Sequence, residues 1–152
     1  MDTVLACLEK ANPRLVQFVE MVGKEDTSFD QIKEELRGIL NQASVKARRP
    51  FCNCLIDICR NRCFPSQRTN EILYLGNLYG LYPGLHTKSS DEWSLNLQPL
   101  SVGAANTAFE EWMKSLSNAI KNEEELPESF SVQLVLEHTG SRRDYLLLLR
   151  HI

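Results

Sequence analysis

Apolar residues recur at helical spacing through the first half of the chain. Asn12 suits a helix cap, and Pro13 suits the first turn of a helix. The apolar residues that follow lie on one helical face: Leu15, Phe18, Val19 and Val22. Ser28 and Gln31 have the spacing of a capping box, and the stripe that accompanies them is Phe29, Ile32, Leu36, Ile39 and Ala43. The pattern predicts one helix that begins at Pro13 and another that begins after Ser28. A short helix is also expected over residues 3–11.

The stretch from Pro50 to Phe64 contains four of the five cysteines. Pro50 suits the first position of a helix, and Pro65 would stop it. At about 100° per residue, one face of this helix carries Cys52, Ile56, Cys59 and Cys63, while Cys54 points away. Free cysteine packs as a small hydrophobe, so we expect this face to pack on a neighbour and to bind no metal or cofactor. A zinc site and thiol chemistry are the alternatives, but zinc needs converging ligands and Cys54 diverges from the others.

Residues 66–81 predict a further helix, and the stretch from Leu81 to Asp91 predicts a loop. Glycine recurs at every fourth position from Gly76 to Gly84, so the alternative is a helix that ends near Gly76. Three tyrosines lie here: Tyr74, Tyr79 and Tyr82. Their rings can stack nucleic-acid bases or pack over the edge of the core.

The second half of the chain changes to an alternating pattern. Trp93, Leu95 and Leu97 alternate with polar residues and predict a strand. An amphipathic helix is predicted from Ala105 to Ile120. The last segment predicts a β-hairpin, in which strands over 130–136 and 145–149 are joined by a turn that begins at His138.

Together these elements predict an α+β fold in a single domain of residues 1–152. An N-terminal helical bundle over about 1–82 would be followed, over about 92–152, by a small, mostly antiparallel sheet that includes the C-terminal hairpin and is covered by the amphipathic helix. No internal repeat is apparent in the sequence.

Composition bears mainly on the compartment. The chain has 152 residues, a net charge of −3 and ordinary globular usage, with 43% hydrophobic and 24% charged residues. The N-terminus lacks the features of a secretory signal, and no apolar run approaches the length of a membrane span. An odd number of cysteines without framework spacing favours a reducing compartment, so a cytoplasmic or nuclear location is predicted, without membrane association.

Charge is concentrated in one segment. From position 46 to position 68 there are six cations and one acid, Asp57, although the chain as a whole is acidic. The six cations form the predicted binding patch: Lys46, Arg48, Arg49, Arg60, Arg62 and Arg68. Such a patch can bind a phosphate backbone or an acidic partner, but it can equally be a solvated face that balances acidic regions of the same protein.

The sequence carries none of the common nucleotide-binding, metalloprotease or hydrolase motifs. We therefore predict a non-enzymatic protein-interaction or regulatory module of the adapter kind, whose partner is another protein or a second copy of the chain. The first alternative is an RNA-binding protein that uses the basic segment 46–68. The second is a zinc- or thiol-dependent enzyme.

Overall fold

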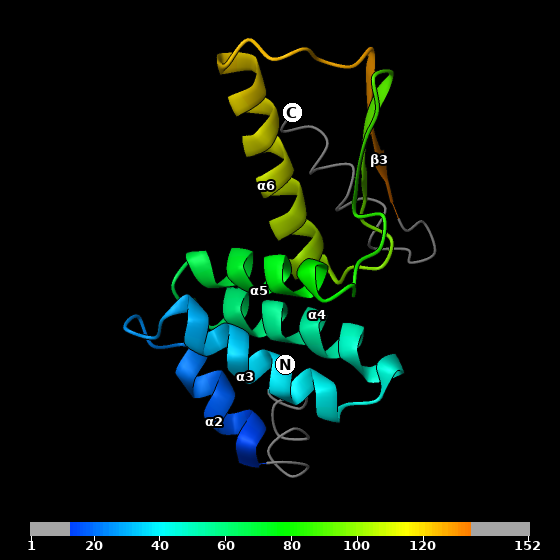
Figure 1. Ribbon diagram of the computed structural model, residues 1–152. Helices are drawn as coiled ribbons and strands as arrows, with labels where there is room; N and C mark the ends of the chain where they lie inside the picture. Colours follow the sequence, from blue (N-terminus) through cyan, green and yellow to red (C-terminus); the bar gives the residue numbers. More distant parts are fainter. Residues whose placement is uncertain (1–12, 135–152) are drawn as a thin grey trace. The chain divides into compact units, whose positions relative to one another are not determined.

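The computed structural model describes residues 13–134, which belong to two compact units, Met1–Leu81 and Tyr82–Ile152. The described part of the first unit is helical and contains α2 to α5 (Figure 1). The second unit contains the strands β1 to β3 and the helix α6. The helix expected over residues 3–11 lies outside the described residues.

The first two helices begin where the capping signals predict. Helix α2 (Pro13–Val22) starts at the first-turn proline, and α3 (Phe29–Gln42) starts directly after Ser28. The capping box of α3 is formed: the Ser28 hydroxyl accepts from the Gln31 amide at 3.2 Å, and the Gln31 side chain accepts from the Ser28 amide at 2.8 Å. These reciprocal bonds satisfy amide groups that a helix start leaves without helical partners.

The cysteine-containing helix is longer at its start than the sequence predicts. Helix α4 (Val45–Asn61) begins before Pro50, which lies inside it and removes one helical hydrogen bond. It ends at Asn61, so Cys63 follows the helix with a φ of 55° instead of continuing the buried stripe. Helix α5 (Gln67–Leu78) continues past Gly76 and stops before Gly80, whose φ of 78° a helix does not allow.

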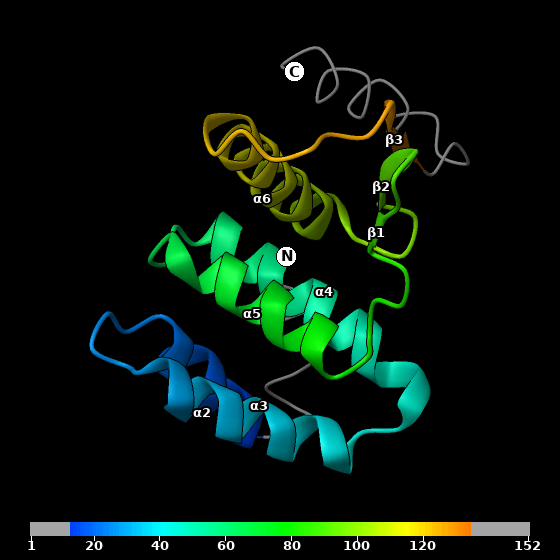
Figure 2. The ribbon, with the colours of Figure 1, turned by 45° about the horizontal axis from the view of Figure 1, so that its top comes forward.

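Figures 1 and 2 show the helices of the first unit as two antiparallel pairs, α2 with α3 and α4 with α5. Two antiparallel helices joined by a short turn are the unit from which helical repeat architectures are built. No repeat was predicted from the sequence, because the two pairs have no obvious residue pattern in common.

The second unit begins with a short hairpin and continues through a crossover helix. Strands β1 (His86–Lys88) and β2 (Glu92–Asn96) are antiparallel, and His86 pairs with Leu95. Helix α6 (Val102–Lys121) then leads to β3 (Ser129–Gln133), which pairs parallel to β2 with Trp93 opposite Phe130. The region of β1 had been predicted as a loop, since three exposed residues give no alternation to detect.

Helix α6 covers the face of the sheet that carries the aromatic residues. The ring of Phe130 lies 5.9 Å from that of Trp93 and 6.3 Å from that of Trp112 on α6, both in edge-on geometry. Most of the predicted apolar face of α6 is buried, but Ile120 is 62% exposed. Although α6 has 20 residues, no helix in the described residues is long and apolar enough to cross a membrane.

The prediction of an α+β fold with a mostly antiparallel sheet is wrong. Helices make up 60% of the structure, and the sheet of the described residues has three short strands. One of its two pairings is parallel, because α6 carries the chain across before β3 joins the sheet. The partner strand that the hairpin prediction requires, over 145–149, lies outside the described residues.

Candidate functional site

The six basic residues of the predicted patch occupy three different places in the first unit. Three are at the N-terminal end of α4: Lys46, Arg48 and Arg49. Two are at its C-terminal end: Arg60 and Arg62. A helix rises 1.5 Å per residue, so these two groups are about 20 Å apart along the axis. The sixth, Arg68, lies in the first turn of α5.

Arg68 is part of the core and does not reach the surface. Its side chain is 2% exposed and donates from Nε to the Val22 oxygen at 2.9 Å. Its Nη2 donates to the oxygens of Lys24 at 2.6 Å and Thr27 at 2.7 Å, and its Nη1 pairs with Glu71 at 3.2 Å. The guanidinium thus satisfies carbonyl groups at the end of α2 and in the loop that follows. Its role is structural.

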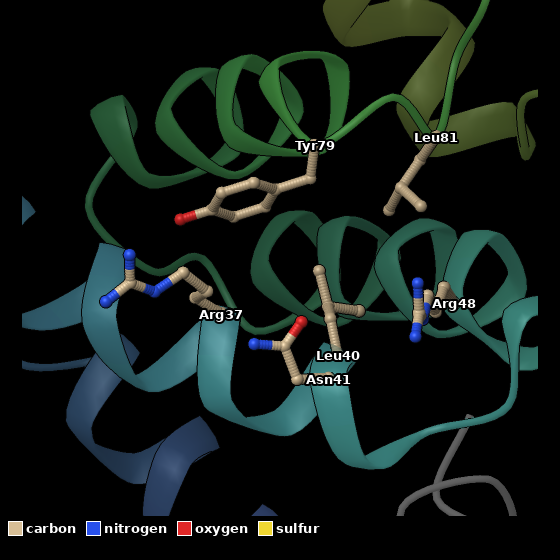
Figure 3. A pocket seen from close by; sticks show the side chains of 6 residues that line it. All are labelled: Arg37, Leu40, Asn41, Arg48, Tyr79 and Leu81. Carbon is tan, nitrogen blue, oxygen red and sulfur yellow. The ribbon is translucent and has the colours of Figure 1, made fainter.

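A pocket of about 170 Å³ opens beside the N-terminal basic group of α4. Its lining residues come from α3, α4 and the segment that ends α5: Arg37, Leu40, Asn41, Arg48, Tyr79 and Leu81. Figure 3 shows the two arginines at opposite ends of the pocket, with Leu40 and Asn41 between them and the ring of Tyr79 on the opposite wall. The pocket therefore combines cationic ends with an aromatic and aliphatic middle.

Main-chain oxygens hold two of the arginines at this end of α4. Arg48 donates from Nε to the oxygen of Ala43 at 3.4 Å, and Arg49 donates from Nε to the oxygen of Leu81 at 2.8 Å. Within residues 13–134, neither guanidinium forms an ion pair with a carboxylate. Each bond fixes one nitrogen and leaves the two terminal nitrogens as donors, an arrangement suited to carboxylate or phosphate oxygens.

The Tyr79 ring is held by its own hydroxyl. That hydroxyl donates to the main-chain oxygen of Lys33 at 3.2 Å, which ties the end of α5 to α3. Burial raises the pKa of Tyr79, Arg37 lowers it and Glu34 raises it, so the phenol is protonated at neutral pH and remains a donor. Arg37 itself pairs with Glu34 at 2.7 Å in an exposed contact.

Of the three tyrosines considered from sequence, only Tyr79 lines this pocket. Tyr82 is 1% exposed, and Tyr74 lies on the surface beside Phe29. Arg37 and Asn41 were not predicted from the sequence to line a site. They are four residues apart, so they share one side of α3, but polar pairs at that spacing occur on most solvent-facing helices and do not mark a site.

The four cysteines of the described residues differ in burial. Cys52 and Cys59 are buried, Cys54 is intermediate and Cys63 is exposed. Burial raises the pKa of Cys59 to about 12, so it is a thiol at neutral pH and lacks the thiolate that nucleophilic catalysis requires. Within the described residues, no group of three or more Cys, His, Asp or Glu side chains is arranged to hold a metal ion.

Comparison with known proteins identifies several plant relatives. The chain is 57% identical to a chloroplastic pentatricopeptide repeat-containing protein of Arabidopsis thaliana over 144 residues, which are 93% of this chain and 19% of the relative. A second such protein of A. thaliana is 40% identical over 82% of the chain and 18% of its own length. One of Zea mays is 30% identical over 95% of the chain and 20% of its own length. The chain thus spans about a fifth of each relative.

No family model and no solved structure matches the chain. The relatives are nevertheless named for a repeat, and pentatricopeptide repeats are helical. This agrees with the paired helices of the first unit and is a second reason to replace the α+β prediction with a helical-repeat fold.

The prediction of a cytoplasmic or nuclear location is wrong. All these relatives are named as chloroplastic, which points to the chloroplast. Cysteine usage separates reducing from oxidising surroundings but does not distinguish one reducing compartment from another.

Proposed function

We propose that this chain binds single-stranded RNA in the chloroplast, without catalysing a reaction on it. The observation that carries the proposal is its similarity, over most of its length, to pentatricopeptide repeat-containing proteins. Repeats of this class bind single-stranded RNA, with one base recognised per helical repeat by two or three side chains. This favours RNA as the partner over the adapter function expected from the sequence.

The surface of the first unit supports the same proposal. At the start of α4, Arg48 and Arg49 have terminal nitrogens available for phosphate oxygens. The neighbouring pocket adds Arg37 and the ring of Tyr79, so cations and an aromatic side chain lie together. Proteins that bind single strands combine these two elements, because cations attract the backbone while aromatic rings stack on bases.

The proposal is tested by fluorescence anisotropy with a labelled single-stranded RNA across a series of salt concentrations. For single strands, log K falls with log salt by about 0.7 for each phosphate contact. We expect the double variant Arg48→Gln/Arg49→Gln to bind more weakly than the wild type and to show a salt slope smaller by about 1.4, since two contacts are lost. The midpoint temperature of thermal unfolding is measured in parallel. This measurement separates a loss of RNA contacts from a loss of stability, because Arg49 also donates a hydrogen bond to the oxygen of Leu81.

Arg60→Gln/Arg62→Gln is the matched control, with the same loss of charge at the opposite end of the same helix. We expect it to retain most of the affinity. Equal losses in both variants would contradict the placement of the contact surface at the start of α4. Wild-type binding no tighter than the non-specific level, about 10⁻⁴ M or weaker at physiological salt, would overturn the RNA proposal and restore the protein-interaction reading.

A further inference from the structure

The pocket between α3, the start of α4 and the end of α5 has the size and chemistry of a site for one small planar group. Its volume of about 170 Å³ is close to that of an engineered apolar cavity of about 150 Å³ that binds benzene. A segment of secondary structure would not enter a space of this size, whereas a single ring system would. The walls offer both apolar surface, from Leu40 and Leu81, and an aromatic ring, from Tyr79.

The polar groups of the pocket are distributed as a nucleotide requires. Arg37 and Arg48 lie at its two ends, where they can meet the phosphates on either side of one sugar (Figure 3). Asn41 lies between them and carries both donor and acceptor groups, which can pair with the edge of a base. An isolated phosphate would use the arginines but not the ring, and a paired base would be prevented from entering by its partner strand.

Two of the side chains that would contact the nucleotide are already fixed, whereas Arg37 forms an exposed ion pair with Glu34 at 2.7 Å. The Tyr79 hydroxyl is bonded to the Lys33 oxygen, and the Arg48 Nε is bonded to the Ala43 oxygen. Side chains that are ordered before binding lose less conformational entropy when the ligand arrives. The Tyr79 ring on the pocket wall is therefore ordered before a ligand binds.

From these contacts we infer that the pocket holds a single unpaired RNA nucleotide, whose base stacks on Tyr79 and whose flanking phosphates contact Arg37 and Arg48. This inference rests on the proposed RNA-binding function and adds to it a defined subsite. It assigns Tyr79 to stacking and the two arginines to the backbone, and these two kinds of contact respond differently to salt.

Tyr79→Leu tests the inference, with a short labelled single-stranded oligoadenylate as the probe. Stacking of one base on an aromatic side chain is worth about a 5- to 150-fold difference in affinity. We expect Tyr79→Leu to weaken binding by a factor in this range while the salt slope stays that of the wild type, because no charge is removed. Tyr79→Phe keeps the ring and loses only the bond to Lys33, so it should bind within about threefold of the wild type.

Tyr74→Leu is the matched control, because Tyr74 is 59% exposed on the same helix and lies outside the pocket lining. It should leave affinity unchanged. The subsite would be overturned if Tyr79→Leu bound RNA with wild-type affinity. It would also be overturned if Tyr74→Leu or Tyr79→Phe lost as much affinity as Tyr79→Leu. None of these results would contradict the RNA-binding function. A wild-type protein that binds no RNA would overturn both, so the two failures are distinguishable.

Discussion

The guanidinium of Arg68 donates a hydrogen bond of 2.7 Å to the main-chain oxygen of Thr27, a residue 41 positions earlier in the chain. This bond joins the first turn of α5 to the loop between α2 and α3, so it connects the two helical pairs of the first unit. The same side chain also holds the oxygens of Val22 and Lys24. A single buried arginine therefore provides the hydrogen-bond donors for three main-chain carbonyl groups.

Substitution of Arg68 by lysine is expected to destabilise the first unit. A lysine keeps the charge but has one compact donor group, which cannot match the separated nitrogens that reach three carbonyls. Unsatisfied buried carbonyls lower the free energy of unfolding by about 1–3 kcal/mol. Urea unfolding followed by circular dichroism measures the change. Arg62→Lys, at an exposed position, serves as the control and should change this free energy by no more than about 0.5 kcal/mol.

The four cysteines within residues 13–134 should react with an alkylating reagent in the order of their exposure. Cys63 is exposed and should be modified first. Cys54 is half-buried, and burial together with Asp57 raises its pKa, so it should follow more slowly. Cys52 and Cys59 should react only in denaturant. Mass spectrometry of partially alkylated peptides gives the order, and early modification of Cys59 in the native protein would contradict the burial described for α4.

Stability should fall at alkaline pH through Cys59. Burial raises its pKa from 9.0 to about 12 in the folded protein, so the unfolded chain loses this proton at a lower pH than the native state does. Below about pH 9 the Cys59 thiol is protonated in both states, and its contribution to the free energy of unfolding is complete. As the pH rises toward 12, this free energy decreases by about 1.4 kcal/mol per pH unit. Unfolding of the wild type and of Cys59→Ala should be compared between about pH 8 and pH 10. The difference in unfolding free energy between them should become smaller, and a constant difference would exclude this linkage.

Phe130 should contribute to the stability of the second unit despite its partial exposure. Its ring contacts both tryptophans of the chain, Trp93 and Trp112. Phe130→Ala is expected to lower the free energy of unfolding by about 1–3 kcal/mol and to change the tryptophan fluorescence of the folded state. Ile120→Ala, at a 62% exposed position on α6, is the control and should leave both nearly unchanged.

Local signals in the sequence located most of the helices. The starts at Pro13 and after Ser28 follow from capping chemistry, which acts within a few residues. Pro50 was misleading, because a proline suits a helix start but also occurs a few residues inside one. The three-residue strand β1 and the parallel pairing of β3 were not predictable, since strand pairing joins segments far apart in the chain.

The sequence by itself determined the existence and approximate position of helices α2 to α6 and the excess of cations between Lys46 and Arg68, because both depend on neighbouring residues. Only the tertiary structure decided what each cation does. Arg68 is buried among carbonyl groups, whereas Arg48 lines a pocket with Arg37 and Tyr79. Residues that are far apart in sequence meet only when the helices pack, so a charge count cannot distinguish a structural arginine from one that is available to a ligand.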